Sequence, residues 1–555
     1  MRVNNFVKRL LCLAPFAGYT AASAEATFPL LLDATLDELR AGLDNGLFTS
    51  VDLVNAYTAR INEVNGALHA VTEINPDALK IAAALDLERE TQTQTAPGDD
   101  SRGPLHGIPV LVKDNIGTAD KLNNTAGSYA LLGARLKQDS TVVIKLRRAG
   151  AIILGKANLS EFASMRSVNQ SSGWSAYGGQ TFGAYLPGQD PSGSSSGSGV
   201  ASSLGLAWAS LGTETAGSIC QPANSNNVVG IKPTVGLTSR FGVVPITEHQ
   251  DTVGPLARTV KDAAILMQAI AGIDQRDNYT LASPFGNDLP DYVAACKESG
   301  LRGKRLGVPK GFADWIPYPP AQPALDAFDG LLDVLRDGGA EVIVDIEMPG
   351  MDKLMELLQG SVVPGADLMT DMPRYLDLLA TNPNNITSVQ ELRDYVHNDP
   401  REMADTYDTE LWDRVLERGL NNTTPEFWDH YTERMYYGGP QAMTGALRNH
   451  TLDALVTPPL YLAILSAVSG APVISVPAGR APEDTPLERN DLDTLNTVGP
   501  NFPFGLAFGG DLFREETLIE IAYAFEQATL VREKVVPYIQ PKTELRDVVE
   551  DVGEL

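Results

Sequence analysis

Three side chains of this sequence could together perform nucleophilic chemistry: Lys113, Ser194 and Ser218. Lys113 interrupts the apolar stretch GIPVLVKDNI, and both serines lie in segments crowded with glycine, serine and threonine. A serine that attacks an amide needs a base for its proton, donors for the developing oxyanion and an acid for the departing nitrogen. Burial in an apolar strand favours the neutral amine of a lysine. We therefore consider Lys113 as the base, Ser218 as the nucleophile and Ser194 as the hydroxyl that passes the proton between them.

Each of these residues also has an ordinary structural interpretation. A lysine such as Lys113 can extend from a sheet edge into solvent, and a serine can be a turn or cap residue. For one residue taken alone, the structural interpretation is the more common one. The occurrence of all three in one chain favours the chemical interpretation.

Two other motifs resemble known sites, but their context opposes that interpretation. The stretch GAIILGK, residues 150–156, has the spacing of a phosphate loop, yet Ala157 stands where Mg²⁺ binding requires serine or threonine, so a buried strand is favoured. The stretch GSSSG places Ser195 as the nucleophile of a hydrolase elbow, but a turn precedes it instead of a strand. The histidines that such an elbow would need lie in uninformative settings: His249, His397, His430 and His450.

Helices and apolar strands alternate along the segments that must position these residues. Helical periodicity covers about 34–92, with Thr35 and Ser50 as expected N-caps. Apolar strands are expected at 107–116, 151–158 and 207–214 and in the later stretches LDALVTPPL and GAPVISVPAG. This alternation predicts an α/β fold with a covered sheet.

The composition is that of an acidic globular protein, and the N-terminal segment predicts export. Its 555 residues carry a formal charge of -27, which disfavours nucleic acid as a partner because phosphate binding depends on Lys and Arg. Residues 1–24, with Arg2, Lys8 and Arg9 before a short apolar run and Ala-Ser-Ala at the end, predict a secretory signal peptide. A membrane anchor or an unstructured terminus is the alternative. After signal removal we expect a secreted chain with no membrane association.

Export bears on two further groups of residues. Cys220 and Cys296 remain after signal removal, and we expect both to be free because a large core needs no disulfide. Glycosylation motifs would suit a secreted glycoprotein. They lie at Asn123, Asn278, Asn385, Asn421, Asn422 and Asn449.

Several long motifs in order resemble the amidase signature family: LHGIPVLVKDNI, GKANLSEFA, GSSSGSGVA, LGTETAGSI and the segment from VVGIKPTVG to QDTVGPLART. The order Lys113, Ser194, Ser218, with Ser218 placed 24 residues after Ser194, is similar as well. The similarity extends from near residue 34 to about 540. AGSICQPA and SGSSSGSGVA are most similar to peptide amidase and to secreted fungal amidases.

The resemblance implies a Ser-cisSer-Lys triad with Ser218 as nucleophile, Ser194 as the proton-relaying serine after a cis peptide bond, and Lys113 as base. It also implies an oxyanion hole made by the backbone N–H groups of Thr215, Ala216, Gly217 and Ser218. No metal or cofactor is implied. Two departures from the family pattern are Ala216, where glycine is common, and the pair Cys220-Gln221, where an arginine is frequent.

The resemblance also implies how the chain is organised. The signal peptide, 1–24, precedes a single amidase domain, 25–540, and an acidic tail, 541–555. Within the domain, the signature core covers about 100–265 and a helical, substrate-covering insertion covers about 275–450. The implied fold is a large, mostly parallel mixed β-sheet covered on both faces by helices.

The implied reaction is hydrolysis of a linear carboxamide to a carboxylate plus ammonia or amine through an acyl-enzyme. The expected partner is a small-molecule or peptide amide, with the C-terminal amide of a peptide as first candidate, and the chain is expected to be a monomer or homodimer. Two alternatives stay open: a tRNA-dependent amidotransferase A-like subunit, and a catalytically inactive secreted binding protein with the same fold.

Overall fold

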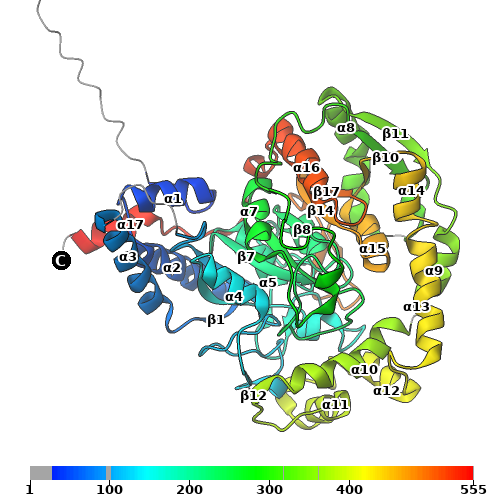
Figure 1. Ribbon diagram of the computed structural model, residues 1–555, viewed down its shortest axis with the longest axis horizontal. Helices are drawn as coiled ribbons and strands as arrows, with labels where there is room; N and C mark the ends of the chain where they lie inside the picture. Colours follow the sequence, from blue (N-terminus) through cyan, green and yellow to red (C-terminus); the bar gives the residue numbers. More distant parts are fainter. Residues whose placement is uncertain (1–27, 96–101, 317, 360–361, 554–555) are drawn as a thin grey trace, which may run out of the picture.

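The computed structural model describes residues 28–95, 102–316, 318–359 and 362–553 (Figure 1). The predicted signal peptide, residues 1–24, lies outside the described residues. Every element that carries a candidate catalytic residue lies within them.

One mixed sheet of eleven strands forms the centre of the molecule. Parallel neighbours occur in two groups, β4-β2-β7 and β13-β10-β11, and the other neighbouring strands are antiparallel. The prediction of an α/β fold with a large mixed sheet is therefore confirmed. In spatial order the strands are β1 (Val71–Ile74), β4 (Ile152–Ala157), β2 (Pro109–Lys113), β7 (Ala209–Glu214), β9 (Thr252–Ala257), β8 (Val229–Lys232), β14 (Val473–Arg480), β17 (Pro503–Gly509), β13 (Ala454–Thr457), β10 (Arg305–Pro309) and β11 (Glu341–Ile346).

Short strands outside this sheet pair two by two in the connecting loops. They are β3 (Arg135–Leu136) with β12 (Leu379–Thr381), β5 (Trp174–Ser175) with β6 (Gly179–Gln180), and β15 (Glu488–Arg489) with β16 (Asn496–Val498).

Helices pack on both faces of the central sheet and bury its apolar side chains. One group of helices in mutual contact consists of α4 (Thr141–Arg148), α7 (Val260–Ile270), α16 (Glu515–Thr529) and α8 (Gln322–Asp337). A second group consists of α5 (Ser196–Ser203), α6 (Cys220–Ser225) and α15 (Pro459–Ser469). Among the helices in the described ranges, none is long and apolar enough to cross a membrane.

The predicted N-terminal helices are present as α1 (Leu36–Asp44), α2 (Ser50–Leu68) and α3 (Ala78–Thr95). Thr35 is the N-cap of α1, as predicted. The prediction for α2 was wrong by one residue, because its N-cap is Thr49. The Thr49 side chain accepts the N–H of Asp52, and the Asp52 carboxylate accepts the N–H of Thr49 (2.8 Å), which completes a capping box. Ser50 is already helical.

The predicted helical insertion, 275–450, also contributes strands to the central sheet. Its strands β10 and β11 form one edge of that sheet. β11 was missed because it is an edge strand whose exposed positions, Glu341 and Asp345 among them, interrupt the apolar pattern. The remaining helices of this region are α9 (Met351–Gln359), α10 (Val363–Leu376), α11 (Val389–Asn398), α12 (Glu410–Arg418), α13 (Pro425–Gly438) and α14 (Met443–Asn449).

A buried ion cluster joins this helical layer to the chain that precedes the candidate serines. The Arg166 guanidinium lies 2.5 Å from Glu161 and 3.2 Å from Glu402, and all three side chains are excluded from solvent. Arg166 also donates to the backbone oxygens of Glu402 (2.7 Å) and Tyr407 (2.5 Å). Burial, and then the Glu402 carboxylate, raise the pKa of Glu161 to about 8.

The expected acidic tail is a docked helix for most of its length. Helix α17 (Leu545–Gly553) packs on α2, and Leu545 is fully buried. The Glu544 carboxylate accepts the backbone N–H of Leu31 (2.7 Å) and pairs with the buried Arg60 guanidinium (3.0 Å). The acidic composition of this segment does not indicate the contact, because the arginine that binds Glu544 is buried and lies far away in the sequence.

Replacement of Glu544 tests this docking. Glu544→Ala leaves the buried Arg60 without its carboxylate, and we expect the free energy of unfolding to fall by about 2 kcal/mol. The matched control is Glu550→Ala on the same segment, because the Glu550 side chain is 70% exposed and its 3.9 Å pair with Arg546 lies in solvent. Urea denaturation followed by circular dichroism compares the two variants. Equal losses in both would contradict the docking role of Glu544.

Candidate active site

Lys113 ends the internal strand β2, between β4 and β7, and its side chain is fully buried. Its Nζ lies 2.8 Å from Ser194 Oγ, 2.8 Å from Thr213 Oγ1 and 3.2 Å from Thr213 O. Burial lowers the pKa of Lys113 to about 7, while the charges of Asp251 and Glu214 act in the opposite direction. Lys113 therefore does not extend into solvent, and much of its population is the neutral amine at neutral pH.

Ser194 is buried in the tight loop that leads into α5. The peptide bond between Gly193 and Ser194 is cis, as the resemblance implied. Packing in this loop is too close for larger residues, because a Cβ at Gly193 would lie 2.4 Å from Ser160 Oγ and one at Gly197 would lie 2.5 Å from the Asn158 nitrogen. The small residues of this segment therefore allow it to pass directly over neighbouring backbone.

Ser218 lies in the turn between β7 and α6, and it is 8% exposed. Its carbonyl accepts the N–H of Ser195 (3.2 Å), so this turn and the Ser194 loop are adjacent. Within the part of the chain that the structure describes, the backbone N–H groups of residues 215–218 have no hydrogen-bond acceptor. Such unpaired donors beside a serine suit a developing oxyanion.

Thr213 and Asn115 complete the surroundings of the lysine, and the sequence did not single them out. Asn115 Nδ2 donates to Thr213 Oγ1 (2.9 Å), which also contacts Lys113. Both residues stand inside the motifs VKDN and LGTETAGSI. Their contact depends on the pairing of β2 with β7, which local sequence does not reveal.

The arginine that the resemblance leads one to expect near the candidate nucleophile is replaced by Cys220, which is a free, fully buried thiol. The N–H groups of Ile219 and Cys220 donate instead to the Glu214 carboxylate (2.7 and 2.9 Å), which fixes the start of α6. The charge of Glu214 is balanced in part by buried Lys232, whose pKa burial lowers to about 8. The second cysteine, Cys296, is also free, as expected.

The two competing motifs have structural roles. Ser195 is fully buried and its Oγ donates to the Thr213 carbonyl (3.0 Å), so it is not an exposed nucleophile. The GAIILGK stretch is the buried strand β4, as favoured, and Lys156 within it donates to Asn124 Oδ1 (3.0 Å).

His249 is held by contacts with a carboxylate and an aromatic ring that the sequence did not indicate. Its Nδ1 lies 3.0 and 2.9 Å from the two carboxylate oxygens of Asp367, and its ring packs against Tyr431 with centroids 4.3 Å apart. Asn422 also donates to Asp367 (3.0 Å). The partner of His249 comes from α10, more than a hundred positions along the chain, so sequence inspection had no local signal for it.

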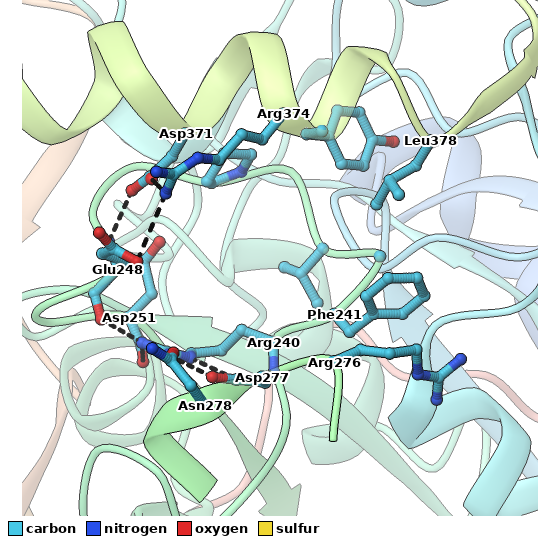
Figure 2. Close-up of a pocket in the computed structure, with 14 residues that line it drawn as sticks. Arg240, Phe241, Glu248, Asp251, Arg276, Asp277, Asn278, Asp371, Arg374 and Leu378 are labelled. Atoms are coloured by element: carbon cyan, nitrogen blue, oxygen red, sulfur yellow. Dashed lines mark hydrogen bonds and ion pairs between the residues drawn. The ribbon is translucent and has the colours of Figure 1, made fainter. Parts of the chain in front are cut away.

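A hollow of about 370 Å³ lies beside this network (Figure 2). Figure 2 shows Asp371 and Arg374 on one wall and Arg240 on the facing wall. Burial, and then the neighbouring Glu248 carboxylate, raise the pKa of Asp371 to about 8. Charged residues from the loop before β9 and from α10 line much of the hollow: Arg240, Glu248, Asp251, Asp371 and Arg374.

A comparison with models of protein families shows the family to which this chain belongs. The model described as Amidase matches residues 52–519. The chain belongs to the amidase signature family. It is 47% identical over 542 residues to a putative amidase of Arthroderma benhamiae, covering 94% of this chain and 90% of that protein. It is 39% identical over 512 residues to a probable amidase of Arabidopsis thaliana, covering 90% and 91%.

Solved structures of the family share the fold. The native peptide amidase of Stenotrophomonas maltophilia superposes with a TM-score of 0.80 at 36% identity, covering 91% of this chain and 99% of that chain. Together with the family match, this confirms the amidase signature fold and a hydrolase that acts on carbon-nitrogen bonds of amides.

The buried amine of Lys113 predicts a characteristic pH dependence of stability. Its pKa of about 7 in the folded enzyme lies below that of an ordinary lysine, so the folded state binds fewer protons than the unfolded state above pH 7. The stability of the wild type should therefore rise with pH, relative to Lys113→Met, from pH 7 towards pH 10. Thermal unfolding of both proteins across this range measures the difference. Lys80→Met, at an exposed position of α3, is the control. If the stability difference between wild type and Lys113→Met rises with pH no more than the difference between wild type and Lys80→Met, the buried amine is refuted.

Proposed function

We propose that this amidase hydrolyses a linear carboxamide through an acyl-enzyme on Ser218, with Lys113 as base and Ser194 as proton relay. The 2.8 Å contact between Lys113 Nζ and Ser194 Oγ in a buried site carries the proposal. Burial keeps much of the lysine in the neutral form, which a general base requires.

Thr213 can orient the lone pair of the base. A neutral lysine amine has two N–H groups and one lone pair, and the carbonyl of Thr213 can only accept. If Thr213 O and Thr213 Oγ1 take the two N–H groups of Lys113, the lone pair is left for the hydroxyl proton of Ser194. The three contacts of Nζ, at 3.2, 2.8 and 2.8 Å, support this division.

The first half of the reaction forms the acyl-enzyme. Ser218 Oγ attacks the amide carbon, its proton passes to Ser194 Oγ, and the proton of Ser194 passes to Lys113. The carbonyl oxygen becomes an oxyanion and accepts the backbone N–H groups of residues 215–218. When the intermediate collapses, the carbon-nitrogen bond breaks and the nitrogen takes a proton back through Ser194. Ammonia or an amine leaves, and an ester to Ser218 remains.

Water completes the cycle by the same proton route. It attacks the ester carbon while Lys113, through Ser194, takes its proton. The second intermediate then releases Ser218 Oγ, which regains a proton, and the carboxylate product. The substrate that we propose first is a C-terminal peptide amide, because a peptide amidase is among the similar solved structures.

Substitution of the three residues tests this mechanism. We expect Lys113→Ala, Ser194→Ala and Ser218→Ala each to lower kcat for ammonia release from peptide amides by about 1,000-fold or more. Ser198→Ala is the matched control and should remain active. Ser198 is a buried serine of α5 whose hydroxyl donates to Leu211 O (3.0 Å). Full activity of the Ser218 variant would exclude the acyl-enzyme.

Two further measurements separate the alternatives. A fluorophosphonate should label Ser218 of the wild type, as read by peptide mass spectrometry, whereas failure to label a folded sample would favour a binding protein. Ammonia release by the isolated chain with water as acceptor opposes a role as an amidotransferase subunit that depends on a partner.

We propose also that the enzyme acts outside the cell after loss of residues 1–24. The basic, then apolar, then small-residue order of that segment supports this. Asn278, Asn385 and Asn449 are exposed and suited to glycosylation, whereas Asn422 is buried. Protein collected from the medium of a eukaryotic host should begin at residue 25 and lose mass on deglycosylation. Retention in the cell with an intact N-terminus would refute export.

A further inference from the structure

Asp251 lies where the proposed oxyanion segment leaves the sheet. It directly precedes β9, and the next residue, Thr252, pairs with Glu214 at the end of β7 in an antiparallel register. The segment 215–218 begins at that end of β7. Asp251 is only 9% exposed, so its carboxylate is held inside the protein beside this segment.

Three donors point at the Asp251 carboxylate. Oδ1 accepts the hydroxyl of Thr215 (2.5 Å), and Oδ2 accepts the backbone N–H groups of Ile246 (2.8 Å) and Thr247 (3.0 Å). Because every contact donates to the carboxylate, the ionised form satisfies all of them without a proton of its own. The side chain thereby ties Thr215 to the loop that precedes β9.

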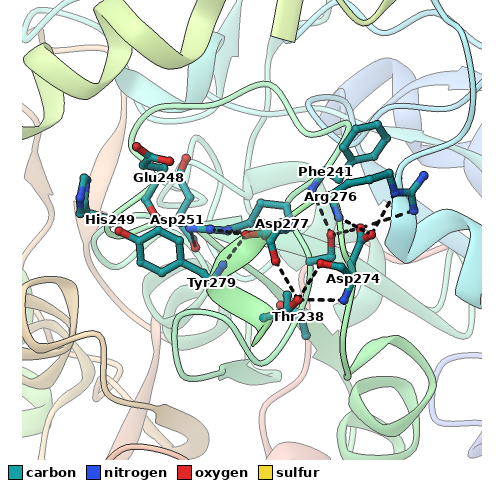
Figure 3. Close-up of polar contacts among 12 residues, drawn as sticks. Thr238, Phe241, Glu248, His249, Asp251, Asp274, Arg276, Asp277 and Tyr279 are labelled. Carbon is teal, nitrogen blue, oxygen red and sulfur yellow. Dashed lines mark hydrogen bonds and ion pairs between the residues drawn. The ribbon is translucent and has the colours of Figure 1, made fainter. Parts of the chain in front are cut away.

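Charged groups from several elements surround Asp251. Arg240 donates to its backbone oxygen (3.5 Å) and pairs with Asp277 (2.6 Å). Figure 3 shows Asp251 between Glu248 and Asp277. The remaining neighbours are Lys113 from β2, Glu214 from β7 and Asp371 from α10.

Asp251 also acts on the base. Among the charged groups near Lys113, the carboxylate of Asp251 raises the pKa of the lysine most, against the larger lowering by burial. Lys113 takes up a proton whenever Ser218 attacks, so an ammonium forms in a site without solvent. Burial raises the pKa of Asp251, while its three hydrogen-bond donors and the charge of Arg240 favour its ionised form. A negative charge at this place stabilises that ammonium.

We propose that Asp251 is a positioning residue for amide hydrolysis: its carboxylate holds Thr215, and with it the oxyanion donors, and stabilises the protonated form of Lys113 during turnover. This inference rests on the function proposed above. It assigns two effects to one side chain, and the two effects can be separated by mutation.

Three variants separate them. Asp251→Asn keeps the shape and removes the charge. The amide oxygen can accept the N–H groups of Ile246 and Thr247, while the NH2 group donates to the Thr215 hydroxyl. Thr215→Val removes the held hydroxyl and keeps the charge. Thr215→Ser keeps a hydroxyl and serves as the conservative control.

The readouts are kcat, KM and the pH profile of kcat/KM for ammonia release. We expect kcat to fall by about 100-fold in both variants with little change in KM: in Asp251→Asn because the charge that stabilises the ammonium is lost, and in Thr215→Val because the oxyanion donors are no longer held. Thr215→Ser should recover most of the loss. Only Asp251→Asn should move the acid limb of the profile to lower pH, since its Lys113 loses the stabilising charge.

A second measurement needs no amide substrate and keeps the two proposals apart. The rate at which a fluorophosphonate labels Ser218 is followed against pH in the wild type and in Asp251→Asn, with thermal unfolding as the check on folding. Labelling of the wild type together with an unshifted, equally fast profile in the variant would overturn the role of Asp251 alone. Absence of labelling in the folded wild type would overturn the proposed function and this inference with it.

Discussion

The burial of a single amine is the constraint on which the site depends. Lys113 ends an internal strand, so two neighbouring strands exclude water from it and lower its pKa to about 7. The same burial would be very costly without partners, and Ser194 and Thr213 supply them at 2.8 Å. The small residues around both serines follow from this arrangement, because loops and strands must approach closely to exclude water from the amine.

The strands that flank the site could be predicted because their signals are local, and the same signals, together with the family resemblance, singled out the three candidate residues. An apolar run interrupted by one lysine and two segments rich in small residues can be recognised without knowledge of the fold. Asp251 and Thr213 could not be assigned in this way, since their contacts with Thr215 and Asn115 depend on strand register. Edge strand β11 and the docked α17 were missed for a related reason, because their exposed charges are typical of loops and tails.

The helical layer is attached to the chain before the Ser194 loop by a buried ion cluster. Arg166 connects Glu161, in the segment before the Ser194 loop, with Glu402 in the layer. All three groups are buried, so loss of Arg166 would leave the carboxylates without their cation in the interior. This cluster therefore fixes the layer to the segment that leads to the Ser194 loop.

The pairing of Leu31 and Arg60 with Glu544 has a consequence for how the chain reaches its final form. The partners stand near opposite ends of a chain of 555 residues. During synthesis the N-terminal helices emerge from the ribosome first and lack this partner until residue 544 has been translated. The contacts of Leu31 and Arg60 with Glu544 therefore form only after the rest of the described fold has been synthesised up to that residue.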